Sequence, residues 1–255
     1  MDMTTPGVSA VLDEADERQL RIDLAAAFRL AALFDWHESV GNHFSAALGG
    51  DGKQFLLNPR WQHFSTLRAS ELLRLHADDD SMLGREGAPD PSAWCIHGAL
   101  HATLPRARVV LHCHPPYATA LCALKDPSIL PIDQNTARFF RRVAIDTGFD
   151  GIAEGRAEGV RLSRALGDSN AMLMGNHGVT VIGESVAQAF EILYFLERAS
   201  KTMVLAYSTG QPLNVMSDAL AEKTAQGWDP YAGMADAHFA QLKQMLDKTD
   251  PSYRD

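Results

Sequence analysis

Residues 109–114, Val-Val-Leu-His-Cys-His, form an apolar run that is followed directly by Pro115 and Pro116. Such a run favours a β-strand, and the prolines end it because proline cannot donate to a strand ladder. Side chains in a strand alternate between the two faces of the sheet. His112 and His114 therefore project from one face at the end of the strand, and Cys113 projects from the other.

The rest of the chain predicts a mixed α/β fold around this strand. The stretch from about 125 to 153 shows no regular pattern, and spaced apolar residues after 210 predict a helical tail. No repeat, low-complexity segment or linker divides the 255 residues, so we expect a single domain over 1–255, with a core over about 18–205 and a tail over about 210–255. Periodicity predicts helices over 12–34, 91–104, 117–124, 155–166 and 185–207, and strands over 43–48, 54–57, 109–114, 171–175 and 178–182.

Charge and composition exclude several classes of partner. Lys and Arg total 23 against 32 Asp and Glu, which gives a net charge of −9. No basic field is available for nucleic acid or an anionic membrane surface. The start of the chain lacks the pattern of a secretion signal. No uninterrupted span of about 20 apolar residues occurs. The three cysteines suit a reducing compartment. We expect a cytoplasmic protein with a small-molecule substrate.

The spacing of the histidines indicates the chemistry of the candidate site. Two imidazoles on one strand face can share a metal ion, and His177, at a turn between two strand-like runs, is the best candidate for a third ligand. The competing interpretation is that His112 and His114 only bond to backbone carbonyls. His97 and His101, four apart on one face of the predicted 91–104 helix, form a rival pair, but the glutamate of a zinc helix is missing because position 98 is Gly.

Several motifs together resemble the class II aldolase/adducin family, over about residues 18–205. The last six residues, Asp-Pro-Ser-Tyr-Arg-Asp, are similar to the end of its bacterial adducin-like branch. The motifs are Gly-Asn-His-Phe-Ser at 41–45, Leu-Asn-Pro at 57–59, Ser-Ala-Trp-Cys-Ile-His at 92–97, Leu-His-Cys-His at 111–114 and Gly-Asn-His-Gly at 175–178.

The resemblance implies a three-layer α/β/α fold with a mixed, largely antiparallel sheet, assembled as a homotetramer. It places the family's metal ligands on His112, His114 and His177. The implied cofactor is a divalent ion, Zn²⁺ first, with Mn²⁺, Fe²⁺, Co²⁺ or Ni²⁺ as alternatives. Such an ion acts as a Lewis acid in carbon–carbon bond cleavage. Asn42 and Ser45 match the family's substrate-binding positions.

One departure from the family bears on the reaction. The acid/base carboxylate of the sugar-phosphate aldolases corresponds to Ala93, and only Ser92 remains of a phosphate-binding serine pair. His97 is the candidate catalytic group, and Arg60 and Trp61 are candidates for binding a substrate carboxylate and ring. We expect a metal-dependent lyase of aldolase or decarboxylase type. The alternatives are an adducin-like scaffold without catalysis, and a metal-dependent epimerase, dehydratase or oxygenase.

Overall fold

The computed structural model of the protein describes residues 12–148, 151, 155–231 and 233–255. Within them a seven-stranded sheet has the order β3-β2-β1-β4-β7-β6-β5, and only β5 and β6 pair in parallel. The strands are β1 (His43–Ala47), β2 (Gln54–Leu57), β3 (Leu73–His76), β4 (Val109–Cys113), β5 (Val143–Asp146), β6 (Ala171–Met174) and β7 (Val179–Gly183).

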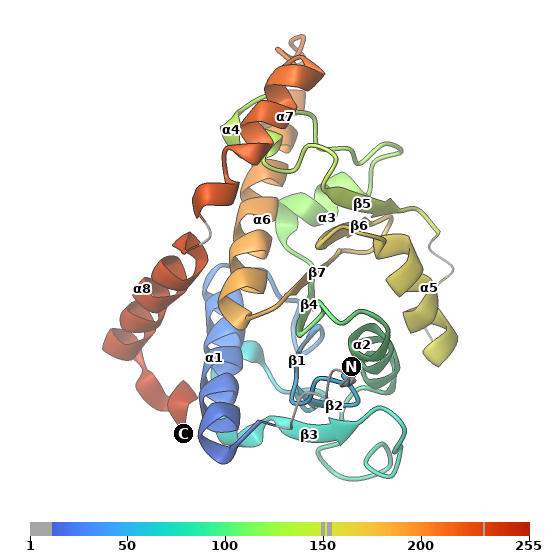
Figure 1. Ribbon diagram of the computed structural model, residues 1–255, viewed down its shortest axis with the longest axis vertical. Coiled ribbons are helices and arrows are strands. Elements are labelled where there is room, and N and C mark those ends of the chain that lie inside the picture. Colours follow the sequence, from blue (N-terminus) through green and yellow to red (C-terminus); the bar gives the residue numbers. More distant parts are fainter. Residues whose placement is uncertain (1–11, 149–150, 152–154, 232) are drawn as a thin grey trace, which may run out of the picture.

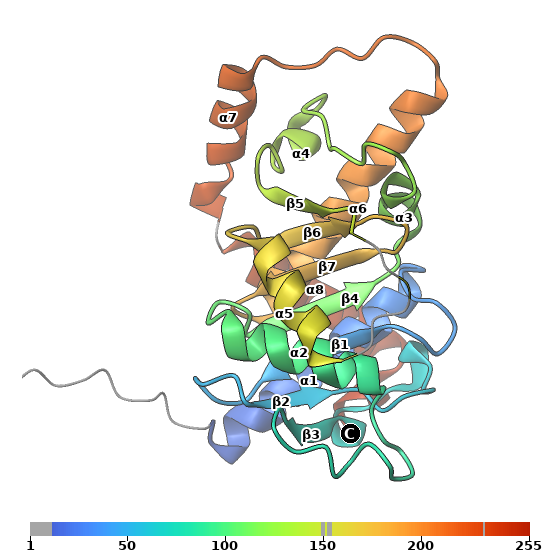
Figure 2. The ribbon, with the colours of Figure 1, turned by 90° about the vertical axis from the view of Figure 1, so that its right-hand side faces the viewer.

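Helices cover both faces of this sheet (Figure 1). On one side lie α1, α6 and α8, and on the other side α2 and α5, which Figure 2 shows in front of the strands. The helices are α1 (Glu14–Leu33), α2 (Pro91–Thr103), α3 (Pro116–Cys122), α4 (Gln134–Ala137), α5 (Arg156–Leu166), α6 (Val186–Ser208), α7 (Asp218–Gln226) and α8 (Met234–Thr249). No helix among the described residues is long and apolar enough to cross a bilayer.

Local sequence explains where the principal helices begin. The Asp13 carboxylate accepts a hydrogen bond from the backbone N–H of Asp16 and caps α1. Asp90 caps α2 in the same way, and Pro91 occupies the first helical position, where its missing N–H costs nothing. Ser185 caps α6. These caps satisfy N–H groups that a helix start otherwise leaves unpaired.

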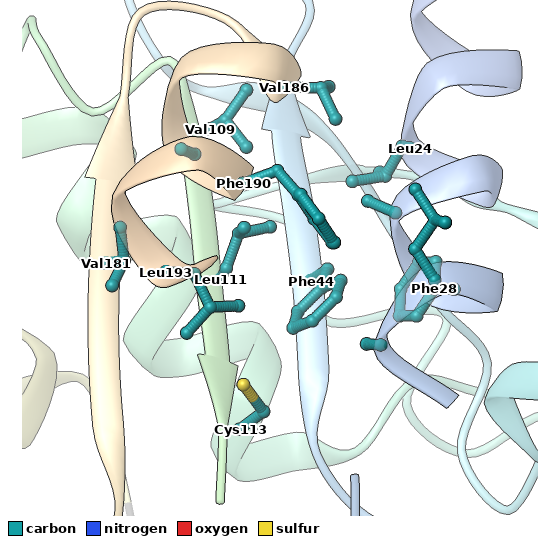
Figure 3. Packing of buried hydrophobic residues seen from close by; sticks show 14 of the residues in the cluster. Leu24, Phe28, Phe44, Val109, Leu111, Cys113, Val181, Val186, Phe190 and Leu193 are labelled. Atoms are coloured by element: carbon teal, nitrogen blue, oxygen red, sulfur yellow. The ribbon is translucent and has the colours of Figure 1, made fainter. Parts of the chain in front are cut away.

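The two-residue period of the strands separates the core from the candidate site. In β4, Val109, Leu111 and Cys113 enter the main core against α1 and α6 (Figure 3), whereas Val110 belongs to a second cluster on the α2 and α5 side. His112 shares a face with Val110 because it lies two residues further along. The apolar packing on one face thereby directs His112 to the opposite one.

The structure confirms the expected mixed, largely antiparallel sheet with helices on both sides and a C-terminal helical tail. Helices and strands lie close to the expected ranges, and a hairpin through Gly49-Gly50-Asp51-Gly52 joins β1 to β2. Two strands were not predicted: β3 and β5 are four residues long and lie at the two edges of the sheet. β3 does alternate apolar and polar side chains, as Leu-Arg-Leu-His, but four residues are the shortest length over which alternation indicates a strand. β5, Val-Ala-Ile-Asp, is as short and lies within the stretch without a regular pattern.

Candidate metal centre and its cavity

Three histidine side chains converge beside the end of β4. Nitrogen atoms of His112, His114 and His177 all lie within 4.8 Å of one another. His177 reaches the other two from the turn between β6 and β7, where Asn176 adopts a positive φ of 56°. The centroid of its ring lies 4.8 Å from that of His112 and 4.9 Å from that of His114. The structure thus brings together the three residues that the sequence spacing favoured.

Hydrogen bonds fix which nitrogen of each strand histidine is available. His112 Nδ1 lies 3.0 Å from the carbonyl oxygen of Val179, so this nitrogen carries the proton. His114 Nδ1 lies 2.6 Å from the Glu38 carboxylate and donates to it. The Nε2 atoms of both rings are left as acceptors, and that of His114 is buried with no hydrogen-bond partner. A buried imidazole nitrogen with an unused lone pair fits a metal ion well.

Two of the three histidines, His112 and His177, are also in the protonation state that metal binding requires. Burial lowers the pKa of His112 well below its usual value, and the neighbouring His177 and His114 lower it further. Burial likewise lowers the pKa of His177, with His114 adding to the effect. Both imidazoles are neutral at pH 7. No proton therefore has to be displaced from them before an ion binds.

Glu38 is expected to strengthen metal binding without contacting the ion. Replacing Glu38 with alanine removes the acceptor that orients His114, and such outer partners contribute about 10–100-fold in metal affinity. We therefore expect zinc affinity, measured by competition with a chromogenic chelator, to fall by about that factor. The exposed Glu184 provides the matched control, since Glu184→Ala should bind zinc normally. Unchanged affinity in Glu38→Ala would show that His114 does not need this hydrogen bond.

A cavity of about 400 Å³ adjoins the three histidines and lies between the sheet and helices α2 and α5. Its polar part includes Asn42, His43, Asp90, Ser92 and His97. Its apolar part consists of Ala93, Ile96, Leu100, Val110, Leu162 and Met174. A partly apolar cavity with a few convergent polar groups is the usual form of a small-molecule site.

His43 is a fourth histidine at this site. Its Cα pairs with that of His112 across β1 and β4, so both side chains lie on the α2 face of the sheet. The ring of His43 is stacked on that of His112 with centroids 5.9 Å apart, and it meets the His97 ring edge-on at the same distance. Burial lowers the pKa of His43 to about 4, although the Asp90 carboxylate opposes the shift.

The rival pair His97 and His101 is joined through a buried serine on β1. Ser45 Oγ lies 2.6 Å from His97 Nδ1 and 2.7 Å from His101 Nε2. His101 Nδ1 in turn lies 2.5 Å from the carbonyl oxygen of Ala107. His97, Ser45 and His101 are all buried, and of the three only His97 lines the cavity.

Acidic side chains predominate among the charged residues that line the cavity. Glu38, Asp90, Asp146 and Glu158 contribute carboxylates, and Arg161 contributes the one cation among the described lining residues. The Arg161 guanidinium donates two hydrogen bonds to Asp146, at 2.9 and 2.8 Å, and two to Glu158, at 2.7 Å each. These bonds lower the pKa of Asp146 and raise that of Arg161. Arg161, the one guanidinium among the described lining residues, is therefore already paired with two carboxylates.

The remaining expected site residues lie in different surroundings. Asn42 lines the cavity, and its Oδ1 accepts a hydrogen bond from the backbone N–H of Glu38. Ser45 is fully buried beneath the cavity, and its hydroxyl is hydrogen-bonded to both His97 and His101. Arg60 and Trp61 lie outside the set of lining residues: the Trp61 side chain is 70% exposed, and the Arg60 guanidinium stacks over its ring at 4.2 Å.

Sequence reasoning assigned no role to His43, Asp146, Glu158 or Arg161. His43 becomes recognisable only when β1 is placed beside β4 in the observed register. Asp146 is in the unpredicted strand β5, and Glu158 and Arg161 share one side of α5, three residues apart. That spacing is typical of an exposed ion pair on any helix, so it gave no signal of a cavity.

Comparisons with known proteins show which sequence family and which solved structures this chain resembles. Residues 22–204 match the family described as Class II Aldolase and Adducin N-terminal domain. The crystal structure of an aldolase II superfamily protein from Pseudomonas syringae has a TM-score of 0.86 and 32% identity, covering 96% of this chain and 98% of that one. L-fuculose 1-phosphate aldolase from Glaciozyma antarctica PI12 has a TM-score of 0.80 at 22% identity, covering 99% and 97%. Alpha-adducin of Rattus norvegicus is 27% identical over 97% of this chain and 36% of its own length.

Proposed function

Because the chain belongs to the class II aldolase and adducin family, we propose that it is a metal-dependent carbon–carbon lyase. The proposed ligands are His112, His114 and His177, and the proposed ion is Zn²⁺, with Mn²⁺, Fe²⁺, Co²⁺ and Ni²⁺ as chemically acceptable alternatives. The observation that carries the proposal is the buried, unpartnered Nε2 of His114 within a cluster of three imidazoles. A scaffold has no use for such an arrangement.

In the proposed reaction some residues of this chain hold the ion and the substrate, and another transfers a proton. A bound divalent ion supplies a Lewis acid that stabilises negative charge on a substrate oxygen. Ala93 is fully buried against the cavity and has no group that can exchange a proton. His97 is the lining residue that we propose transfers the proton instead. The apolar residues beside it exclude water from the reacting atoms.

The charges of the cavity favour a substrate without a phosphate group. Four carboxylates and one doubly paired guanidinium line it among the described residues. A phosphate dianion would meet like charges there, and such contacts cost several kcal/mol. The apolar side chains of Ile96, Leu100 and Leu162 would instead contact a hydrocarbon or aromatic part of the substrate. We propose a small hydroxy-carbonyl compound or hydroxy acid with such a substituent.

This preference predicts a clear result with matched substrates. For a hydroxy-carbonyl compound offered with and without a terminal phosphate, we expect kcat/KM of the zinc-loaded chain to be at least about tenfold higher without it, from the like-charge cost. Product formation is followed by NMR, which separates aldol cleavage, decarboxylation, epimerisation and dehydration. His112→Ala is the control for metal dependence. A preference for the phosphorylated substrate would contradict the charge argument.

The same assay separates the proposed function from its alternatives. Epimerised or dehydrated products, or oxygen consumption with Fe²⁺, would assign a different metal-dependent reaction to the same three histidines. A zinc-loaded chain that converts no compound of either class would favour an adducin-like binding role.

We further propose a homotetramer, which sedimentation of the purified chain tests directly.

A further inference from the structure

A buried line of hydrogen bonds runs from the cavity into the protein behind α2. It passes from His97 through the hydroxyl of Ser45 to His101, and it ends on the carbonyl oxygen of Ala107. His97 and His101 lie four residues apart in α2 and face the sheet, where Ser45 projects from β1. Every bond in this line is 2.7 Å or shorter, so each one needs a proton between its two atoms.

The direction of the bond between His101 and Ala107 is fixed by the carbonyl oxygen at the end of the line. A carbonyl oxygen can only accept, so His101 Nδ1 must carry a proton. Burial lowers the pKa of His101 to about 4, although the bond to Ala107 opposes the shift. His101 is therefore neutral at pH 7, and its second nitrogen, Nε2, has a lone pair. The hydroxyl of Ser45 must donate to that lone pair.

The remaining bond follows from the single proton of a hydroxyl group. Ser45 donates its proton to His101, so its oxygen can only accept from His97. His97 Nδ1 therefore carries a proton. Burial lowers the pKa of His97 well below its usual value, and the nearby His43 and His101 lower it further. A neutral His97 with its proton on Nδ1 has a lone pair on Nε2, the nitrogen left for the cavity that this residue lines.

We propose that Ser45 and His101 are positioning residues that hold His97 in the Nδ1–H tautomer, so that Nε2 acts as the proton acceptor of the reaction. This inference rests on the proposed lyase function and selects among its forms. Aldol cleavage begins with removal of a proton from a hydroxyl group, which a lone pair can accept. A decarboxylase needs a donor for the carbanion left by carbon dioxide, and neutral His97 has no proton on Nε2 to give.

The proton and electron pairs balance within one turnover. His97 Nε2 accepts the hydroxyl proton of the substrate while the O–H electron pair forms the new carbonyl bond. The carbon–carbon bond breaks, and its electron pair passes to the fragment that keeps the original carbonyl, as an enolate. His97 then returns the proton to the enolate carbon. Throughout the cycle the Nδ1 proton stays on its bond to Ser45, so no proton has to pass along the line.

The tautomer can be measured without any substrate. The full chain is labelled with ¹⁵N-histidine and loaded with zinc, and long-range ¹H–¹⁵N correlation shows which nitrogen of each ring carries a proton; His97→Gln assigns the signals. We expect His97 to carry its proton on Nδ1. In Ser45→Ala we expect loss of this fixed tautomer, with zinc content unchanged. Ser200 is the matched control, because its buried hydroxyl donates to the Leu196 carbonyl in α6 and Ser200→Ala should change nothing.

Activity provides the second measurement. For a cleaved substrate, Ser45→Ala should lower kcat by about 10²-fold, the lower end of what a positioned proton-transfer group contributes, with little change in KM. Ser45→Thr keeps the hydroxyl and should restore the tautomer and most of the rate. A proton on Nε2 of His97 in the wild-type chain, or an unchanged tautomer and kcat in Ser45→Ala, would overturn the inference. The expected tautomer with no cleavage of any substrate would overturn the proposed function and the proton-acceptor role, but not the hydrogen-bond directions.

Discussion

Replacing His177 with alanine is expected to remove nearly all bound zinc and to abolish turnover. His177 is one of three imidazoles whose nitrogen atoms lie within 4.8 Å of one another. The two that remain come from a single strand end and cannot enclose an ion. Since an outer partner of a metal ligand already contributes about 10–100-fold in affinity, loss of a direct ligand should exceed that range.

Metal content per chain is the decisive measurement. Wild type, His112→Ala and His177→Ala are purified without chelator or added metal and compared by elemental analysis. The control is His76→Ala, because His76 lies outside the cavity lining and bonds to the backbone of Asp78. We expect about one ion in wild type and the control, and very little in the two ligand variants. A wild-type chain that takes up no Zn²⁺, Mn²⁺ or Fe²⁺ would contradict the metal site and favour a scaffold.

Periodicity predicted that His112 and His114 lie together because their placement is local. The strand at 109–114 ends at two prolines, and alternation alone places His112 and His114 on one face. The core confirms the reason: Leu111 and Cys113 pack with α1 and α6 on the opposite face (Figure 3). His177 could be added because a turn between two short strands projects its side chain beyond the sheet edge. The turn lies beside His112 and His114 because β4 pairs with β7, a contact between distant segments that periodicity alone does not give.

The rest of the cavity depends on strand order, which periodicity does not determine. His43 reaches His112 because β1 pairs with β4 although more than 60 residues separate them, as the register shows. The same pairing places Ser45 beneath α2, where it joins His97 to His101 rather than binding a substrate. Trp61 was expected near the site because it follows the Leu-Asn-Pro motif and carries a ring, but the structure leaves it 70% exposed and outside the cavity lining. Residue type alone did not determine which of the expected side chains line the cavity.

A single methyl group at Gly178 is expected to disable the metal centre while all three histidines remain. A Cβ built at Gly178 would lie 2.2 Å from His114 Cδ2, 3.0 Å from His114 Nε2 and 2.8 Å from the carbonyl oxygen of Cys113. The carbonyl belongs to β4, so the backbone at residue 178 must shift away from it, and the imidazole of His114 must move as well. Its Nε2 is the atom that faces the ion. Gly178→Ala should therefore lower zinc affinity by at least about 10²-fold, as much as loss of an outer partner or more.

The cost of Gly178→Ala to folding can be measured separately from its cost to metal binding. Forcing a methyl group into a packed site typically costs about 1–3 kcal/mol, which urea unfolding of the metal-free chain measures apart from zinc titration. Gly84→Ala is the matched control, because nothing lies within 4 Å of its added Cβ, and it should change neither quantity. If Gly178→Ala binds zinc as the wild type does, the ring of His114 is not held in place by this contact. Retained folding with lost zinc would instead show that Gly178 is required because His114 occupies the space of its missing side chain.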